Sequence, residues 1–319
     1  MSDIRSGRDL VDNPIPDIKY RVEGLLRANG GRLSLTGQAK TKKSFLAMDL
    51  ALRIAAGDDW LGYNTTQGKV LYLNLEISCE KFQERIQDLQ YTLKYDKEVL
   101  ARFQEITILD DNIALNSDID CMQGILGECK DKGFKVDTLI IDPRARAIDG
   151  SENEETEIKM FCDNVDKLLA ANPSLSIVIV THMGKDPSKG ALGHSRYTGW
   201  LDTEIKIIKG GDDYDKKIEI TGRDAEQTTI KLDFAYPLHT VSEDEEFVRQ
   251  TKVEEATVFI INRLEGKVMS RQRLRRKAMT EGITDYAFTT AIRKLKDNGT
   301  IKLVKAKGPG NRKLLKLTK

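Results

Sequence analysis

The pattern of apolar and polar positions divides the chain into two regions. From residue 32 to residue 234, short runs rich in leucine and β-branched residues alternate with longer stretches in which apolar residues recur at helical spacing. The short runs predict strands at 32–37, 69–75, 105–109, 138–142, 176–181, 204–208, 217–221 and 229–234. The longer stretches predict helices at 43–56, 80–93, 119–132 and 154–171.

This alternation predicts an α/β fold with a mostly parallel sheet. The inner strands are nearly continuous apolar runs, which is typical of strands whose two faces are both covered by helices. The last three strands follow one another without intervening helices, so we expect them to form an antiparallel extension at one edge of the sheet.

The pattern changes near the C-terminus. An acidic, polar stretch is followed by three predicted helices, the second capped by Ser270 and the third by Thr284. Two short strands then flank a Gly-Pro-Gly-Asn turn. Three helices followed by a basic hairpin are typical of a winged helix-turn-helix domain. The predicted organisation is a lead-in at 1–24, an α/β domain at 25–236, an acidic linker at 237–252 and a winged helix at 253–319.

Composition narrows the class of protein. Hydrophobic residues make up 39% of the chain and charged residues 32%, which excludes wholesale disorder. No run of 18 apolar residues is present, so we expect no contact with a membrane. The first 14 residues lack the apolar segment of a secretory signal, and the four cysteines form no C-x-x-C pair. We therefore expect a cytoplasmic protein with reduced thiols, without disulfides or a zinc site.

The net charge of +1 conceals a strong asymmetry. Residues 252–319 carry 18 Lys and Arg against 6 Asp and Glu, whereas the preceding 251 residues carry 33 against 44. A basic tail on an acidic body indicates two modules with different partners, and nucleic acid is the obvious partner for the tail. The alternative is that the tail packs against the acidic body of its own or a neighbouring chain.

The first candidate for chemistry is the segment GQAKTKKS at 37–44, between a predicted strand and a predicted helix. A phosphate-binding loop needs backbone N–H groups around the anion, a lysine for the outer phosphates and a hydroxyl for magnesium. Gly37, Lys43 and Ser44 occupy three of the four invariant positions of that motif, but Lys42 replaces its second glycine. A lysine side chain at this position is compatible with a functional loop, to which it could add positive charge near the phosphates. It is equally compatible with a site that hydrolyses nucleotide slowly or only binds it. The predicted nucleotide contacts are Gly37, Gln38, Ala39, Lys40, Thr41, Lys42, Lys43, Ser44 and Phe45.

Three further residues follow predicted strands. Glu76 and Asp142 each come at the end of an apolar strand, where open α/β sheets bind ligands, and His182 follows a third strand. Asp142 is suited to holding magnesium, together with Ser44. Each residue has a simpler interpretation, as a helix cap or a surface group, but their order after a phosphate loop favours a shared site.

These segments, with IIDPRARAIDGSENE and IVIVTHMGKDP, resemble RecA-like ATPases of the RepA-type plasmid helicase group, relatives of the DnaB-type ring helicases. The resemblance covers residues 25–235 and implies ATP and Mg²⁺ as cofactors. It implies that Glu76 is the general base, that Asp142 is the Walker B aspartate and that His182 couples the nucleotide state to DNA. Arg85 matches the spacing of an arginine that recurs in those helicases.

Ring ATPases of this kind supply a further arginine from the neighbouring subunit. Arg223, just after a late strand, is the first candidate for this arginine finger, and Arg196 is the second. An isolated arginine on a loop is otherwise simply solvated.

Several basic residues are candidates for DNA contact. The Gly-rich segment 183–199 carries Lys185, Lys189 and Arg196, which would contact the backbone of single-stranded DNA. An ordinary surface loop is the alternative. In the winged helix, the candidates for duplex contact are Arg271, Arg273, Arg275, Arg276, Lys277, Arg293, Lys294, Lys296, Lys305, Lys307, Arg312 and Lys313.

The sequence thus predicts an ATP-dependent DNA-handling enzyme, a ring-forming helicase or translocase in the replication of a plasmid, phage or mobile element. Two alternatives remain open. The first is a nucleotide-binding regulator or loader that does not separate strands. The second is a non-catalytic DNA-binding protein with a decayed ATPase fold.

Overall fold

The computed structural model describes residues 5–12, 18–109, 113–183, 195–210, 215–223, 225, 227–305 and 313–318. The chain divides into two compact units. The larger unit is Lys19–Ser242, and the smaller one combines Met1–Ile18 with Glu243–Lys319.

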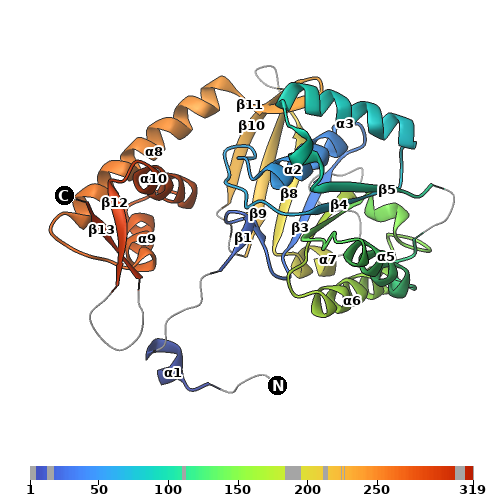
Figure 1. Ribbon diagram of the computed structural model, residues 1–319, viewed down its shortest axis with the longest axis horizontal. Coiled ribbons are helices and arrows are strands. Elements are labelled where there is room, and N and C mark those ends of the chain that lie inside the picture. The colour runs from blue at the N-terminus through green and yellow to red at the C-terminus, as the bar shows by residue number, and fades with distance from the viewer. Residues whose placement is uncertain are drawn as a thin grey trace. The chain divides into compact units, whose positions relative to one another are not determined.

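A sheet of nine strands, counted among the described residues, forms the centre of the larger unit in the order β11-β10-β9-β8-β3-β7-β6-β4-β5 (Figure 1). Its strands are β3 (Arg32–Gly37), β4 (Val70–Asn74), β5 (Phe103–Thr107), β6 (Thr138–Asp142), β7 (Ser176–His182), β8 (Thr203–Lys209), β9 (Lys216–Gly222), β10 (Thr228–Ala235) and β11 (Leu238–Val241). The run from β8 to β5 is parallel throughout. The predicted mostly parallel α/β sheet is confirmed, and it is consistent with a RecA-like fold.

The edge of the sheet differs from the prediction in two details. β8 pairs parallel with β3, so the antiparallel extension consists of β9, β10 and β11. The short helix α7 (Ser195–Trp200) precedes β8, which begins beside Leu33, near the start of β3. β11 lies in the segment predicted as a linker, because Leu238–Val241 folds back on β10 in a hairpin.

Helices cover both faces of the parallel strands (Figure 1). α2 (Lys43–Ala56) and α3 (Cys79–Leu93) lie on one face, and α5 (Ile119–Asp131), α6 (Glu155–Ala171) and α7 lie on the other. On the second face, Leu73, Ile141 and Ile179 belong to one apolar cluster with residues of these helices. α2 is buried on nearly all sides, as expected for a helix that is apolar all round.

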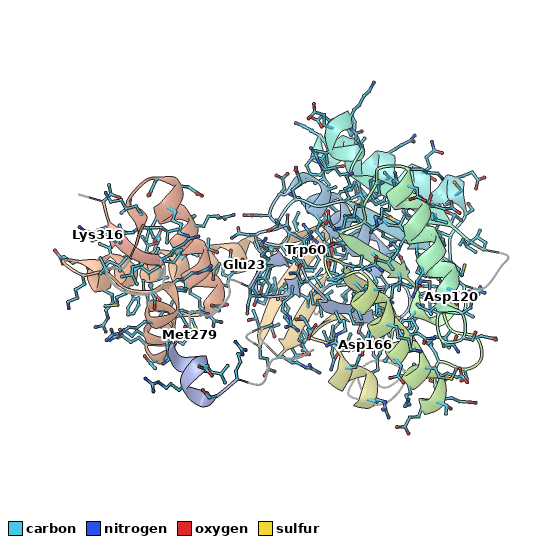
Figure 2. The ribbon with its side chains drawn as sticks, turned by 60° about the horizontal axis from the view of Figure 1, so that its bottom comes forward. Glu23, Trp60, Asp120, Asp166, Met279 and Lys316 are labelled. Atoms are coloured by element: carbon cyan, nitrogen blue, oxygen red, sulfur yellow. The ribbon has the colours of Figure 1, made fainter. Side chains whose placement is uncertain are left out.

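Shorter elements complete the larger unit. They are the hairpin of β1 (Tyr20–Val22) and β2 (Leu26–Arg27), the helix α4 (Lys97–Leu100) and the 3-10 helix η1 (Arg144–Arg146). The labelled Trp60 lies inside this unit, whereas Asp120 of α5 and Asp166 of α6 lie on its surface (Figure 2). Of the helices that the described residues form, none has the length and apolar character needed to cross a membrane.

The smaller unit contains α8 (Glu243–Leu264), α9 (Arg271–Thr280), α10 (Asp285–Asp297), β12 (Ile301–Lys305) and β13 (Lys313–Leu317), in addition to α1 (Gly7–Asp12). Ser270 and Thr284 cap α9 and α10 as predicted, each accepting a hydrogen bond from a backbone N–H group. Ile260, Leu274, Phe288, Ile292 and Leu315 belong to its apolar core.

The segment predicted as a linker, 237–252, contains regular secondary structure, and the division between the two units falls within it. Its first part forms β11, and its acidic part begins the 22-residue helix α8 at Glu243. Acidic residues favour the first turn of a helix because of the helix dipole, so the same composition that indicated a linker also starts a helix.

A buried histidine lies in the antiparallel extension. His239 of β11 is 3% exposed, and neither ring nitrogen has a hydrogen-bond partner among the described residues. Its ring lies 4.7 Å from that of Phe234, its cross-strand neighbour. Burial, with a smaller effect of Lys216 and Lys42, lowers the pKa of His239 to about 3.

This pKa predicts an acid-dependent loss of stability. In the unfolded chain the imidazole takes up a proton below its usual pKa of about 6.5, whereas the folded chain rejects it until about pH 3. The free energy of unfolding should therefore fall by about 1.4 kcal/mol per pH unit below pH 6.5. His239→Asn should remove this component, which amounts to about 2 kcal/mol between pH 6.5 and pH 5.

Urea unfolding at both pH values, followed by tryptophan fluorescence, provides the measurement. Trp60 and Trp200, the chain's two tryptophans, both belong to the larger unit. An equal pH dependence in the wild type and the variant would contradict the prediction.

Candidate active site

The candidate residues meet at one edge of the sheet because parallel strands end on the same side. Gly37, the last residue of β3, pairs with His182, the last residue of β7. Asn74, the last residue of β4, pairs with Asp142, the last residue of β6. This is the edge at which open α/β sheets bind ligands.

The loop between β3 and α2 is a tight turn. The N–H group and the hydroxyl of Thr41 both donate to the Gln38 carbonyl oxygen, and Lys40 and Lys42 have φ angles of 65° and 66°. A Cβ atom on Gly37 would lie 2.8 Å from the Ile207 carbonyl oxygen, so only glycine fits there. Left-handed residues in such a loop turn successive N–H groups toward one centre, an arrangement that binds anions.

Lys43 is the first residue of α2, and its ammonium group lies inside this turn. It donates to the carbonyl oxygens of Gly37 and Gln38, both at 2.8 Å, and lies 3.4 Å from Nδ1 of His182. Burial lowers the pKa of Lys43, while the charges of Asp142 and Glu76 act in the opposite direction. The structure thus brings a cation, the loop and His182 together.

Asp142 is 5% exposed and lies beside this cation. The Tyr72 hydroxyl donates to its Oδ2 at 2.6 Å, whereas Oδ1 is buried with no hydrogen-bond partner among the described residues. Burial raises the pKa of Asp142, and the hydrogen bonds from Tyr72 and Ser44 and the charge of Lys43 partly oppose this. Burial also raises the pKa of Tyr72 well above its usual value, so the hydroxyl stays protonated as a donor.

The residues present fit a magnesium ion. Ser44 is one of the groups that lower the pKa of Asp142, and the unpaired Oδ1 offers a carboxylate oxygen to a cation. Within the described part of the chain, no three His, Cys, Asp or Glu side chains gather as a metal site. Mg²⁺ binds few protein ligands and keeps water and substrate phosphate oxygens in its shell.

Glu76 lies two residues beyond the end of β4. Its side chain is exposed, unlike that of Asp142, yet its charge influences the pKa values of both Lys43 and Asp142. An exposed carboxylate close to a buried cation is suited to accepting a proton from a water molecule.

An aromatic cluster, defined as Phe45, Phe234 and Tyr236, lies beside the loop. The Phe45 ring contacts those of Phe234 and Tyr236 edge-on, at 5.7 and 5.4 Å. The Arg85 guanidinium lies 4.7 Å from the centre of the Phe45 ring. Tyr236 is 57% exposed and donates its hydroxyl to Asp88 at 2.6 Å. The exposed Tyr236 ring and the half-buried Arg85 guanidinium are groups that can stack on a nucleotide base.

The sequence interpretation missed Tyr72, Phe234 and Tyr236. Two signals were available. A buried tyrosine in an apolar strand needs a partner for its hydroxyl, which indicated Tyr72. Because β9 and β10 form a meander, β10 ends at the same edge as β3, which brings Phe234 to the loop.

Lys42 occupies a conformation that favours glycine. A left-handed conformation costs a non-glycine residue about 1–2 kcal/mol. The Lys42 ammonium lies 5.8 Å from the centre of the Phe45 ring and 5.6 Å from that of Phe234. Each exposed cation–π contact contributes about 0.5–1 kcal/mol, so the two contacts are of the size needed to offset the backbone cost.

Of the two candidate finger residues, Arg223 lies away from the loop of its own chain. Gly37 lies beside Ile207 of β8, whereas Arg223 follows Gly222, which pairs with Thr203 at the other end of β8. Four residues of strand, about 13 Å, separate those two positions on β8. Arg223 donates to the Gly199 carbonyl oxygen, and Arg196 of α7 lies 3.9 Å from a Glu155 carboxylate oxygen.

Some of the predicted DNA contacts lie among the described residues, and others do not. In the smaller unit, Arg271 and Arg273 are exposed on α9, Lys294 is exposed on α10, and Arg293 is half-buried there. Lys305 ends β12. The residues Lys185, Lys189, Lys307 and Arg312 lie outside the described ranges.

Comparison with known proteins finds a family that matches the chain. A family described as an AAA domain matches residues 4–188, more than half of the chain. No curated protein matches the chain. The match covers the loop, Glu76, Asp142 and His182, and it supports a P-loop ATPase.

The close approach at Gly37 generates a prediction about stability. In Gly37→Ala the new methyl group would lie 2.8 Å from the Ile207 carbonyl oxygen and 3.0 Å from Thr41 Oγ1. We expect the free energy of unfolding to fall by about 1–3 kcal/mol, the usual cost of overpacking. Urea unfolding followed by tryptophan fluorescence measures it.

Gly124→Ala in α5 is the matched control. A Cβ atom on Gly124 meets nothing within 4 Å, so this variant should gain about 0.5–1 kcal/mol from its helix propensity. If Gly37→Ala were as stable as Gly124→Ala, the loop would not be packed as described.

Proposed function

Since the chain belongs to the AAA domain family, we propose that it is an ATP-hydrolysing, DNA-handling protein, a RepA- or DnaB-like ring helicase or translocase. We further propose that it acts in the replication of a plasmid, phage or mobile element. The single observation that carries the ATPase function is the meeting of Lys43, Asp142 and His182 at the carboxyl edge of the sheet.

Each residue has a role that follows from its surroundings. When bound, Mg²⁺ neutralises phosphate charge and holds the outer phosphates in position. Ser44 and Asp142 would hold the ion, and the Lys43 ammonium would exchange its two loop carbonyls for phosphate oxygens. Glu76, exposed at the end of β4, would orient the attacking water and take its proton. His182, 3.4 Å from the lysine, would respond to the outer phosphate.

Arg223 supports assembly into an oligomer. It lies at the opposite end of β8 from the loop, so it does not reach the loop of its own chain. In a ring, the same arginine would face the loop of a neighbouring copy and stabilise the charge of the transition state there. Arg196 remains the second candidate for this role.

The smaller unit is the proposed duplex-binding part. Its order of three helices and a two-stranded hairpin supports a winged helix, with α10 as the recognition helix. α9 presents Arg273 and Arg276 to solvent on one turn. Phosphate contacts from such cations give affinity without sequence preference.

Steady-state ATP hydrolysis, with and without single-stranded DNA, tests the proposed function. Lys43→Ala should abolish nucleotide binding or turnover because the loop loses its cation. Glu76→Gln should retain nucleotide binding and lose at least a hundredfold in kcat, since a general base contributes about 10²–10⁴. Turnover that DNA stimulates and Glu76→Gln removes is the expected result.

Two other outcomes would change the assignment. Nucleotide binding without turnover would favour the regulator or loader that dispenses with strand separation. Failure of the wild type to bind nucleotide would leave a DNA-binding protein with a decayed ATPase fold.

The double variant Arg273→Ala/Arg276→Ala should weaken duplex binding. The slope of log K against log salt is negative, and each lost phosphate contact reduces its magnitude by about 0.9. The magnitude should therefore decrease by up to about 2 in the double variant. Fluorescence anisotropy of a labelled duplex, titrated at several NaCl concentrations, measures both affinity and slope.

The matched control is Lys130→Ala/Lys132→Ala, which removes two exposed cations from the larger unit. This control should bind duplex like the wild type. Equal losses in both double variants would show that net charge alone attracts the duplex.

A further inference from the structure

The side chain of Lys42 leaves the phosphate loop in a defined direction. Its ammonium lies over two rings, that of Phe45 on α2 and that of Phe234 on β10. Phe45 is 4% exposed, so this contact joins an exposed loop residue to a buried one. The residue that departs from the glycine of the loop motif is therefore attached to the sheet.

A second lysine approaches the same ring. The Lys216 ammonium, on β9, lies 4.8 Å from the centre of the Phe234 ring. Burial lowers the pKa of Lys216, with a further contribution from the positive charge of Lys42, while Asp215 opposes both. Two ammonium groups thus share one aromatic ring, and the Asp215 carboxylate offsets part of the positive charge at Lys216.

The backbone of Lys42 controls how α2 begins. Lys42 is the N-cap residue of α2 and adopts φ 66° and ψ 29°. Its carbonyl oxygen accepts a hydrogen bond from the Leu46 N–H group at 3.3 Å. The first N–H groups of a helix bind anions, so the orientation of this residue decides where those of Lys43 and Ser44 point.

We propose that Lys42 is a positioning residue of the phosphate loop, which anchors the left-handed turn before Lys43 to Phe45 and Phe234. Glycine would adopt the same conformation without strain, but it would leave the turn free to sample other conformations. In this chain a side-chain anchor provides the order that the glycine motif obtains from bound phosphate. The inference rests on the proposed nucleotide binding.

The proposal and its rival predict opposite effects for one substitution. If Lys42 only impaired the loop, Lys42→Gly would restore the motif and tighten nucleotide binding. If Lys42 anchors the loop, the same variant should bind nucleotide more weakly, because binding must then order a mobile turn.

The test measures the Kd of a fluorescent ATP analogue, together with KM and kcat for ATP. Lys42→Gly should raise Kd and KM three- to tenfold and leave kcat within twofold of the wild type. Lys42→Arg retains a cation that can stack on both rings, so its Kd should stay within twofold of the wild type.

A double-mutant cycle with Phe234→Leu shows whether Lys42 affects nucleotide affinity through the Phe234 ring. Phe234→Leu alone should raise Kd by a similar factor. The Kd of Lys42→Gly/Phe234→Leu should be no higher than that of the single variant that binds more weakly. Tryptophan fluorescence and thermal unfolding show that each variant is folded before its Kd is compared.

Each other outcome is decisive. Equal or tighter binding by Lys42→Gly, or additive losses in the double variant, would overturn the anchor and leave the proposed nucleotide site standing. If the wild type bound no better than Lys43→Ala, the nucleotide site and the anchor would both be wrong.

Discussion

The parallel register of β4 against β6 is the constraint on which the rest of the site depends. The Leu75 N–H group donates to the Asp142 carbonyl oxygen at 2.9 Å, which extends the parallel register of β4 and β6 beyond Asn74. This register brings Glu76 to the same edge as Asp142. A slip of one residue would turn every side chain of β4 to the other face of the sheet. Tyr72 would then no longer reach Asp142.

The same edge of the sheet holds two buried charged side chains, those of Asp142 and Lys43. Asp142 is buried, and the nearby charges of Lys43 and Glu76 have opposite effects on its pKa. The Lys43 ammonium is already inside the loop, bound to carbonyl oxygens that hold the turn in shape. Phosphate oxygens would replace existing partners of that cation, so the loop needs little reorganisation to receive an anion.

The parts of the structure that depend on sequence-local patterns were predictable. β6 and β7 follow from unbroken apolar runs, and α2 follows from helical spacing directly after the loop. The caps at Ser270 and Thr284 follow from the hydrogen-bonding capacity of short polar side chains.

Features that depend on distant contacts were not predictable. The left-handed turn at Lys42 involves Phe234, 192 positions further along the chain. The direction of β8 depends on α7, a six-residue helix whose glycine-containing sequence has no clear helical period. The acidic run at Glu243 is equally compatible with a solvated linker and with the first turn of α8.

The placement of Arg223 has a consequence for the symmetry of the proposed assembly. A loop at one edge of the sheet and its complementary arginine at the other make the contact between copies heterologous, since each copy offers a different surface to each neighbour. Such contacts add copies in one direction and leave one loop and one arginine unmatched until the chain of copies closes. The rotation between neighbours, rather than the chemistry at their interface, would then decide between a closed ring and an open filament, and with it the number of copies.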